Sequence, residues 1–591
     1  LGRLVHIQHP DAQDDIRYHY DLQDEKDPHG RSMHGTSLGR LSRIEDRHSR
    51  IDFAYDSYGN LIRDQRRLTI DQQTHQLTTE YRYTRGNQLA GITYPNGQQV
   101  TYHYHQGQLD SISLDENSQQ KVLVSDIRHR PFGPIEQWRN GNGLIQQLEY
   151  DLDGRITEVR VSPEDSSSGI KAPVLWQQQY RYDLSNNITG IQGKQSRLDT
   201  ESYRQQFGYD RLQRLTQDKG HYGEHSFTYD AVGNRLSHRQ QSGNQTQQEN
   251  YRYAPASNRL LGTSNQEITL DELGNLLRES KTIANQNSLT EEDESTAVER
   301  SYNYNGHNRI SEYHENGVLK ARYHYNALGQ RIHKAVIQPD GSEQHTLFHY
   351  GQNGELLSEI QLDSADTATT GPTQNIVWLH MRPVVALDSD PQTSDNSQIT
   401  WLHSDHLLTA RVATDSDQNL IWRWHSDAFG VGQAESLTAN GTVHNNEAAF
   451  AFNLRFPGQY YDAENGLHYN YFRTYDPQLG RYTQSDPIGL LGGMNTFAYA
   501  GSSPMGFVIN IAEELNLSYA LLAPTGRASK VLKNYTGREA YTIHKKIGFG
   551  GFEEVESIPE DIILVDEASM CDISIATKLM SVVRDGRLVI F

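Results

Sequence analysis

The sequence predicts a mainly β fold up to about residue 508 and a short α/β segment after it. Three observations lead to this prediction. A short pattern, Tyr-Asp followed by Gly and then Asn or Arg, recurs at intervals of about twenty residues. Of the 591 residues, 34 are Tyr and 47 are Gly, although only 35% are hydrophobic; tyrosine buries a ring and keeps a polar tip, which suits a thin β-wall. After residue 508, stretches typical of strands alternate with stretches typical of helices.

The recurring pattern defines the first predicted domain, residues 1–397. In the copy that ends at Asp230, alternate strand residues point to opposite faces, so Phe227 and Tyr229 share one face. We expect Asp230 to accept hydrogen bonds from the next turn, and Gly233-Asn234 to tolerate a positive φ. Each copy is a β-hairpin, and because one hairpin is marginal in water, the copies must pair in a long twisted sheet that can wind or close on itself. Other copies are Tyr55-Asp56 with Gly59-Asn60, Tyr150-Asp151 with Gly154-Arg155, Tyr209-Asp210 with Arg214, Leu270-Asp271 with Gly274-Asn275, and Tyr325-Asn326 with Gly329.

Composition excludes several classes of function for the chain as a whole. The net charge of −21 argues against general binding to nucleic acid or to an anionic membrane, because both need a basic surface. A single cysteine, Cys571, excludes an internal disulfide framework. We find no apolar stretch long enough to span a bilayer. The chain begins with Leu1, so we expect a missing N-terminal part, and the absence of a signal peptide says little about export.

The repeat residues also admit two functional interpretations. Exposed tyrosines on a β-surface can bind sugars, which would make the chain a cell-surface carbohydrate-binding protein. The aspartates could be calcium ligands, but they lack the dense acidic spacing of a calcium loop. The sequence favours a structural role for both residue types.

A closing block, residues 398–508, forms the second predicted domain. Within it, His403, Asp405 and His406 could be metal ligands, but neighbouring histidines on a strand point apart and no third ligand is indicated, so packing in the core is favoured. The block consists of the runs Trp401-Leu402-His403-Ser404-Asp405-His406, Trp424-His425-Ser426-Asp427-Ala428-Phe429-Gly430, Arg455-Phe456-Pro457-Gly458-Gln459-Tyr460-Tyr461-Asp462, Glu464-Asn465-Gly466-Leu467, Tyr469-Asn470-Tyr471-Phe472-Arg473, Tyr475-Asp476-Pro477, Gly480-Arg481-Tyr482 and Ser485-Asp486-Pro487-Ile488-Gly489-Leu490.

The repeats resemble the YD-repeat, or Rhs, family, and the closing block resembles the Rhs repeat-associated core domain along most of its length. The resemblance implies a hollow β-shell that acts as a container rather than a catalyst. It implies that the core domain plugs this shell and that a variable C-terminal toxin stays inside. The expected protein is a secreted or exported bacterial effector of the polymorphic-toxin type, with an enclosed cargo and a secretion-system or toxin-complex partner.

The same resemblance assigns a self-cleavage site. By motif match, Asp486 is the first catalytic aspartate and Arg473 the assisting arginine. Two carboxylates that share a proton can act as general base and acid on a peptide bond. The family's second aspartate lies in a following Asp-Pro-X-Gly-Leu motif, where this chain has Ile509-Asn510. We therefore predict no self-cleavage, and the interpretation of Asp486 as a turn aspartate before a proline stays open.

The third predicted domain, residues 509–591, has the pattern of a parallel α/β sheet. An apolar strand, Ile562 to Val565, ends in Asp566-Glu567, which would place carboxylates at the edge of the sheet where ligands bind. This segment resembles the ATPase core of RecD-like superfamily 1 DNA helicases. The resemblance implies that Asp566 binds Mg²⁺, that Glu567 orients the attacking water, and that Thr525, Gly526 and Arg527 contact single-stranded DNA.

The helicase-like segment departs from that family at its start. A phosphate-binding loop, Gly-x-x-x-x-Gly-Lys-Ser/Thr, should precede it, but residues 492–506 contain no lysine. Without that loop the phosphates of a nucleotide have no cradle. We expect no cofactor, with ATP and Mg²⁺ relevant only if the tail is functional, and nucleic acid bound only through the tail. We favour a chimera of two coding sequences over a natural fusion, with the helicase-like module as fused cargo as the alternative function.

Overall fold

The fold is known from a computed structural model that describes most of the chain. The described residues are 2–23, 25–26, 30, 32–70, 72–131, 133–164, 173–194, 203–283, 296–362, 371–390, 397–438, 441–443 and 450–499, and, in the tail, 518–523, 526, 529, 538–548, 557–565, 578–579, 581–583 and 588–590. Two large antiparallel sheets of 20 and 16 strands dominate it, so the prediction of a mainly β fold is confirmed. Among these residues, no helix is both long and apolar enough to cross a bilayer.

The first sheet pairs each strand with its neighbours along the chain. A short 3-10 helix, Ala12–Asp14, lies between its first two strands. Its strands are β1 (His6–Ile7), β2 (Ile16–Tyr20), β3 (Leu41–Glu45), β4 (Ser49–Tyr55), β5 (Leu61–Ile70), β6 (Gln73–Tyr83), β7 (Leu89–Thr93), β8 (Gln99–His105), β9 (Gln108–Glu116), β10 (Gln119–His129), β11 (Ile135–Asn140), β12 (Ile145–Tyr150), β13 (Ile156–Ser162), β14 (Trp176–Tyr182), β15 (Ile188–Lys194), β16 (Tyr203–Tyr209), β17 (Leu215–Gly220), β18 (Gly223–Tyr229), β19 (Arg235–Ser242) and β20 (Gln245–Asn250).

The second sheet continues the same hairpin series as far as residue 436. Its strands are β21 (Arg252–Tyr253), β22 (Leu260–Gly262), β23 (Gln266–Leu270), β24 (Leu276–Ile283), β25 (Thr296–Tyr304), β26 (Ile310–Glu315), β27 (Val318–Tyr325), β28 (Arg331–Ile337), β29 (Glu343–Tyr350), β30 (Leu356–Leu362), β31 (Thr373–Leu379), β32 (Arg382–Ser389), β33 (Gln398–Ser404), β34 (Ala410–Thr414), β35 (Leu420–Trp424) and β36 (Ala434–Ser436).

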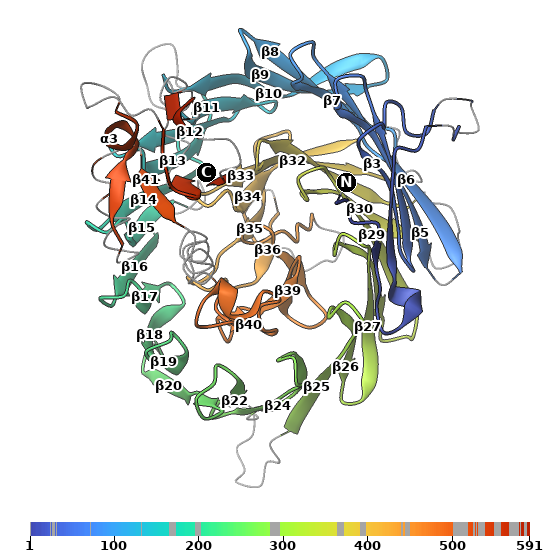
Figure 1. The fold of residues 1–591 in the computed structure, drawn as a ribbon. Coiled ribbons are helices and arrows are strands. Elements are labelled where there is room, and N and C mark those ends of the chain that lie inside the picture. Colours follow the sequence, from blue (N-terminus) through green and yellow to red (C-terminus); the bar gives the residue numbers. More distant parts are fainter. Residues whose placement is uncertain are drawn as a thin grey trace.

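The wall made by these sheets winds more than once around a central space (Figure 1). The first sheet forms an outer turn, and strands β28–β35 of the second sheet pass inside it. Side chains tie the two turns together: Arg66 Nη1 donates to Gln330 Oε1 at 2.9 Å, and Trp401 Nε1 donates to the Leu123 carbonyl at 2.9 Å. The winding that the repeat pattern predicts is therefore present, and the wall overlaps itself.

The main hydrophobic core lies between the two turns. Outer-turn residues such as Val100 and Trp138 pack in one cluster with inner-turn residues such as Val377 and Val385. Strands of the outer turn alternate between buried and less buried positions, whereas the first six residues of β32 are all buried. The run Val384-Val385-Ala386-Leu387 is apolar throughout because both of its faces are covered.

Each repeat turn is built as the sequence predicts. Asp56 Oδ1 accepts hydrogen bonds from the backbone amides of Tyr58 and Asn60, both at 2.9 Å, and its Oδ2 accepts from Asn60 Nδ2 at 2.9 Å. Gly59 has a φ of 94°, which favours glycine. Burial raises the pKa of Asp56, but these hydrogen bonds outweigh it and hold the pKa below its ordinary value. The same contacts recur at Asp151, Asp183, Asp210, Asp230 and Asp415.

The tyrosine of most repeats has a second role that the sequence analysis missed. The Tyr209 hydroxyl donates at 2.8 Å to the carbonyl of Ile188, the first residue of the returning strand in the preceding repeat. We call this contact the tyrosine tie. It joins successive hairpins, and the hydroxyls of these tyrosines point into the wall rather than outward. Other ties are Tyr55 to Leu41, Tyr83 to Leu61, Tyr104 to Leu89, Tyr150 to Ile135, Tyr182 to Ile156, Tyr229 to Leu215, Tyr253 to Arg235 and Tyr304 to Leu276.

The repeat turns, apart from the one at Asp415 between β34 and β35, lie on one rim of the wall. Successive strands are antiparallel, so the turn after every second strand returns to the same rim. The connections on the other rim vary widely in length, from the tight turn between β9 and β10 to the long connection between β13 and β14. We call these the turn rim and the connection rim.

The tail forms a separate, small parallel sheet. Its strands are β41 (Tyr519–Ala523), β42 (Ala540–Thr542), β43 (Ile562–Val565) and β44 (Leu588–Ile590), in the order β42-β41-β43-β44, with helix α3 (Ile543–Ile547) after β42. All three pairings are parallel, as the sequence predicts. Its own core includes Leu522, Ile543 and Ile563.

The tyrosine tie can be tested by removing one hydroxyl. Tyr209→Phe leaves the Ile188 carbonyl without its donor, and we expect local stability to fall by about 1 kcal/mol. Amide hydrogen exchange in β15 and β16 measures this change. Tyr58→Phe is the matched control, because that side chain is 77% exposed at a turn tip, and its exchange should be unchanged. Equal exchange in wild type and Tyr209→Phe would contradict the tie.

Candidate functional site: the plug and the inner face of the wall

A small antiparallel sheet sits in the middle of the ring (Figure 1). Its strands are β37 (Tyr460–Asp462), β38 (Leu467–Asn470), β39 (Arg473–Asp476) and β40 (Arg481–Tyr482), and a short 3-10 helix, Gly489–Gly492, follows. Tight turns at Gly466 and Gly480, both with positive φ, let these short strands fold back on each other. We call residues 450–499 the plug.

The plug contacts the turn rim of the wall. Gln484 Nε2 donates to the Asn308 carbonyl at 2.9 Å, and the Tyr471 hydroxyl donates to the Leu328 carbonyl at 2.8 Å. Both wall residues lie in repeat turns, between β25 and β26 and between β27 and β28. The repeat turns therefore carry the plug as well as reversing the chain.

Wall arginines beside these turns reach onto aromatic rings of the plug. The Arg309 guanidinium lies 4.9 Å from the centre of the Phe472 ring, and that of Arg331 lies 4.4 Å from the Tyr469 ring. Such cation–π contacts favour the bound position when the cation is desolvated. Arg331 is 1% exposed, so its contact is of the buried kind.

A buried ion network fixes the plug to the inner turn. Arg331 Nη1 lies 2.6 Å from Asp462 Oδ2, and Lys334 Nζ lies 3.2 Å from carboxylate oxygens of both Asp462 and Glu464. The Tyr323 hydroxyl donates to Glu464 Oε1 at 2.7 Å. Burial lowers the pKa of Lys334, but the Glu464 and Asp462 carboxylates outweigh it and hold that pKa above its ordinary value.

The sequence analysis missed this network, although it quoted the run that contains Asp462 and Glu464. A usable signal was present, because acidic residues within an aromatic run need a buried cation if they are themselves buried. The partners Arg331 and Lys334 lie more than a hundred residues earlier in the chain, and nothing local connects the two runs.

The structure brings Arg473 and Asp486 together, as the motif match requires. Arg473 Nη2 lies 3.2 Å from Asp486 Oδ2, and each side chain is 17% exposed. The Arg473 guanidinium also lies 3.7 Å from the Tyr482 ring centre. Asp486 Oδ1 accepts from the Ile488 amide at 3.1 Å, which is the contact of a turn aspartate. The position corresponding to the second aspartate, Ile509-Asn510, lies outside the described residues.

Most of the helicase-like site residues also lie outside the described residues: Thr525, Arg527, Asp566 and Glu567. Gly526 is described, and its carbonyl accepts from Ser529 Oγ at 3.1 Å. Strand β43 ends at Val565, and it is the strand flanked by β41 and β44.

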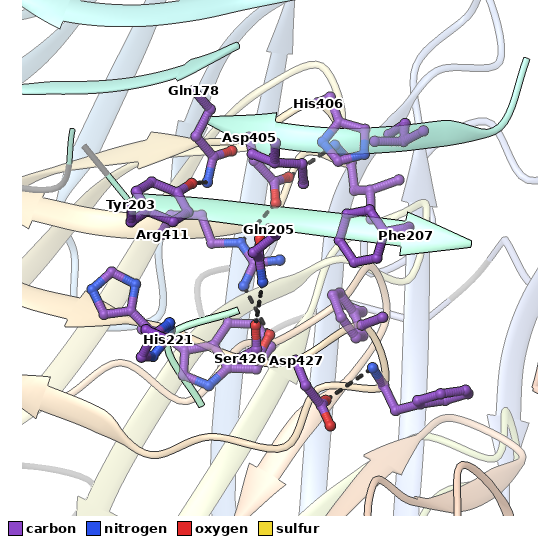
Figure 2. Close-up of a pocket in the computed structure, with 18 of the residues that line it drawn as sticks. Gln178, Tyr203, Gln205, Phe207, His221, Asp405, His406, Arg411, Ser426 and Asp427 are labelled. Atoms are coloured by element: carbon purple, nitrogen blue, oxygen red, sulfur yellow. Dashed lines mark hydrogen bonds and ion pairs between the residues drawn. The ribbon is translucent and has the colours of Figure 1, made fainter. Parts of the chain in front are cut away.

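A cavity of about 310 Å³ lies where the inner turn leaves the outer wall (Figure 2). Strands β14–β17 form one side, and the segments after β33 and β35 form the other. A third of its lining residues are aromatic, and they include Trp176, Tyr203, Phe207, Trp424 and Phe429. A cavity of this size can hold a small molecule or one large side chain.

Paired polar groups cross this cavity. Arg411 Nε lies 2.7 Å from Asp405 Oδ2, and its Nη1 donates to Ser426 Oγ at 3.1 Å. Burial raises the pKa of Asp427 to about 7, although the amides of Val431 and Phe429 donate to its carboxylate.

The residues considered as metal ligands have packing roles. The His403 ring nitrogens lie 3.3 Å from Gln146 Oε1 and 2.9 Å from Thr414 Oγ1. Asp405 Oδ1 caps its own repeat turn, and the His406 ring packs 4.4 Å from the Tyr180 ring.

Comparison with known proteins finds relatives that match the wall and the plug. The toxin protein Tse5 of Pseudomonas aeruginosa is 25% identical over 529 residues, which cover 79% of this chain and 36% of Tse5. The probable deoxyribonuclease RhsA of Dickeya dadantii is 23% identical over 73% of this chain and 25% of its own length. The chain is similar to Rhs-type repeat proteins. It spans about a third of Tse5 and a quarter of RhsA.

Solved structures support the fold of this chain. The crystal structure of TcdB2-TccC3 matches with a TM-score of 0.62 at 19% identity, over 84% of this chain and 26% of that one. At this identity the likeness establishes the fold alone.

The tail matches a different family. The AAA domain model matches residues 505–591. The ATP-dependent RecD2 DNA helicase of Deinococcus radiodurans is 37% identical over 107 residues, which cover 17% of this chain and 14% of the helicase. The two resemblances recognised in the sequence are therefore confirmed.

The buried ion network can be tested by removing Arg331. Arg331→Met leaves the buried Asp462 carboxylate with only Lys334, and we expect the plug to lose about 3–5 kcal/mol of stability. Amide hydrogen exchange in β37 and β38 measures the loss. Arg252→Met is the matched control, because Arg252 is 53% exposed in its pair with Glu267 and such pairs contribute about 0–1 kcal/mol. A loss no larger than that of the control would contradict the network.

Proposed function

We propose that this chain is the shell and delivery scaffold of an Rhs-type polymorphic toxin, which encloses a polypeptide carried on the C-terminal side of its plug. The observation that supports the proposal most directly is the plug, which lies inside a wall that winds around it and is held by the buried Arg331–Asp462 pair. A folded catalyst does not need such a wall, whereas a container does.

We further propose that the chain is an exported bacterial effector with a partner in a secretion system or toxin complex. The name of Tse5 as a toxin and the presence of two named components in TcdB2-TccC3 support this part. The net charge of −21 fits a soluble delivery particle rather than one that binds nucleic acid along its whole surface.

The paired Arg473 and Asp486 do not amount to a working self-cleavage site in this proposal. Hydrolysis of a peptide bond by an aspartate pair needs a second carboxylate, and the sequence has Ile509-Asn510 at that position. The chain is expected to stay in one piece, with its plug and tail covalently joined.

The container role predicts protection of the segment that follows the plug. In native full-length protein, residues 518–591 should resist protease, and Arg331→Met should raise their cleavage rate at least tenfold because the plug loosens. Fragments are identified by gel and mass spectrometry, and untreated protein should give a single band near 67.3 kDa. The Arg252→Met control should match wild type. Equal cleavage in wild type and Arg331→Met would overturn the container role, and an untreated band split near residue 515 would overturn the absence of self-cleavage.

A second candidate function is a nucleotide-dependent activity of the tail. The parallel order of β41–β44 and the AAA domain match favour it. Against it, residues 492–506 offer no lysine for a phosphate-binding loop, so we propose that neither ATP nor Mg²⁺ is bound productively. We also propose that the tail was joined to the shell as a chimera, which a sequencing read across codons 470–530 of the source genome would test.

The nucleotide proposal has a direct measurement. Titration of the full chain with a fluorescent ATP analogue and Mg²⁺ should give no saturable binding below millimolar concentration and no phosphate release. Glu567→Gln, which would abolish hydrolysis in a working site, should behave like wild type. Micromolar binding, or hydrolysis that disappears in Glu567→Gln, would instead establish the tail as an active cargo.

A further inference from the structure

Histidines gather where the overlap of the two turns begins. Here strands β4–β6 of the outer turn lie outside β27–β29 of the inner turn (Figure 1). Arg66 of β5 contacts Gln330, and Asp46 Oδ2 accepts from the Ala327 amide at 2.6 Å. These contacts close the wall together with an apolar cluster that joins Leu68 and Leu77 to Ile332, because no strand pairing joins one turn to the other at this edge in the described part of the chain.

Three adjacent inner strands each contribute one histidine to a continuous row. His324 Nδ1 lies 3.0 Å from His333 Nδ1, and His333 Nε2 lies 3.0 Å from His345 Nδ1. The outer turn adds His48, whose ring centre is 4.7 Å from that of His324, and His75, whose charge would act on both His333 and His345. We call these five residues the histidine row.

The ring contacts limit how many protons the row can hold. Each nitrogen–nitrogen contact at 3.0 Å needs one N–H and one bare nitrogen, which neutral rings supply. A single proton on His333 is still compatible, because both of its nitrogens can then donate. A second proton on His324 or His345 would leave an N–H on both sides of its contact with His333. Two N–H groups cannot form a hydrogen bond with each other, so that contact must break.

The charges around the row do not compensate for added protons at its centre. The groups that face His333 are all bases: His324, His345, His75 and Arg322. In the described part of the chain, carboxylates contact the row towards its two ends, where Glu343 Oε2 is 3.4 Å from His345 Nε2, and where Asp46 and Asp14 act on His48 together with Arg47.

We propose that the histidine row is an acid-sensitive latch, which holds the leading edge of the overlap closed at neutral pH and lets it open in acid. The geometry carries this proposal, since the row bridges the two turns at the edge where contacts between side chains and backbone close the wall. Opening at this edge would unwind the container without unfolding its hairpins. The use of such a latch in cargo release rests on the proposed function, whereas the opening itself does not.

The direction of the pH effect follows from the shifted groups. Burial and the neighbouring histidines lower the pKa of His333 to about 2, and burial lowers the pKa of His48 and His75. The closed edge therefore binds fewer protons than the open edge. The latch is complete above the ordinary histidine pKa of about 6.5 and is lost progressively as the pH falls below it.

Amide hydrogen exchange on the full chain between pH 7.5 and 5 tests the latch, with the intrinsic exchange rate corrected at each pH. The opening constant of β5, β6, β28 and β29 should rise about tenfold per pH unit for each proton taken up, so about hundredfold per unit for two protons. In His333→Gln, the dependence of the opening constant on pH should correspond to about one proton fewer than in wild type. Since His333 is buried and this variant could fail to fold, His48→Gln, at a partly buried position where burial lowers the histidine pKa, provides a second test with the same expectation.

His103→Gln is the matched control, because His103 lies on β8 away from the row and contacts Ser113 Oγ. It should leave the slope at the leading edge unchanged. An opening constant that is the same at pH 5 and 7.5, or a wild-type slope that persists in both row variants, would overturn the latch. Because no cargo is involved, this result is independent of the protease test of the container.

Discussion

A wall made of hairpins is one layer thick, and one layer cannot bury two faces. This constraint governs the whole molecule. The chain meets it by passing its second turn inside its first, so that Val377 and Val385 cover the inner face of Val100 and Trp138. Hydrophobic burial is the main favourable term in folding, and this cluster is buried only once the overlap has formed. The individual repeats therefore depend on partners that are hundreds of residues away in sequence.

The plug extends the same solution to the inner turn. Strands that already face the outer turn would still expose their inner side, and the aromatic plug covers part of it. At this second interface, charged groups add to a buried apolar cluster: Arg331 and Lys334 meet Asp462 and Glu464 in a buried site. A buried ion pair is not in itself a strong source of stability, but it strongly penalises any position in which one partner is left alone. The network thus fixes where the plug sits.

Local features of this architecture could be predicted from sequence, and long-range ones could not. The turn at Asp56 and Gly59 follows from residue chemistry within five positions, and the structure has it as expected. The proximity of Arg473 and Asp486 came from a family resemblance and is also present. The contact between Arg66 and Gln330 spans 264 residues and has no local signature. The tyrosine tie lies between these cases, because its acceptor is a backbone carbonyl, which leaves no trace in the side-chain pattern.

The two rims of the wall differ in how closely their contacts fix the length of the chain. On the turn rim, the same few positions form the five-residue turn, the tyrosine tie and the plug contacts. A single inserted residue there would therefore disturb three interactions at once. On the connection rim, lengths already differ from the tight turn after β9 to the long link after β13. An engineer who wished to display a foreign peptide on this particle would therefore graft it on the connection rim, and a lineage that lengthens its shell would do so by duplicating whole hairpins.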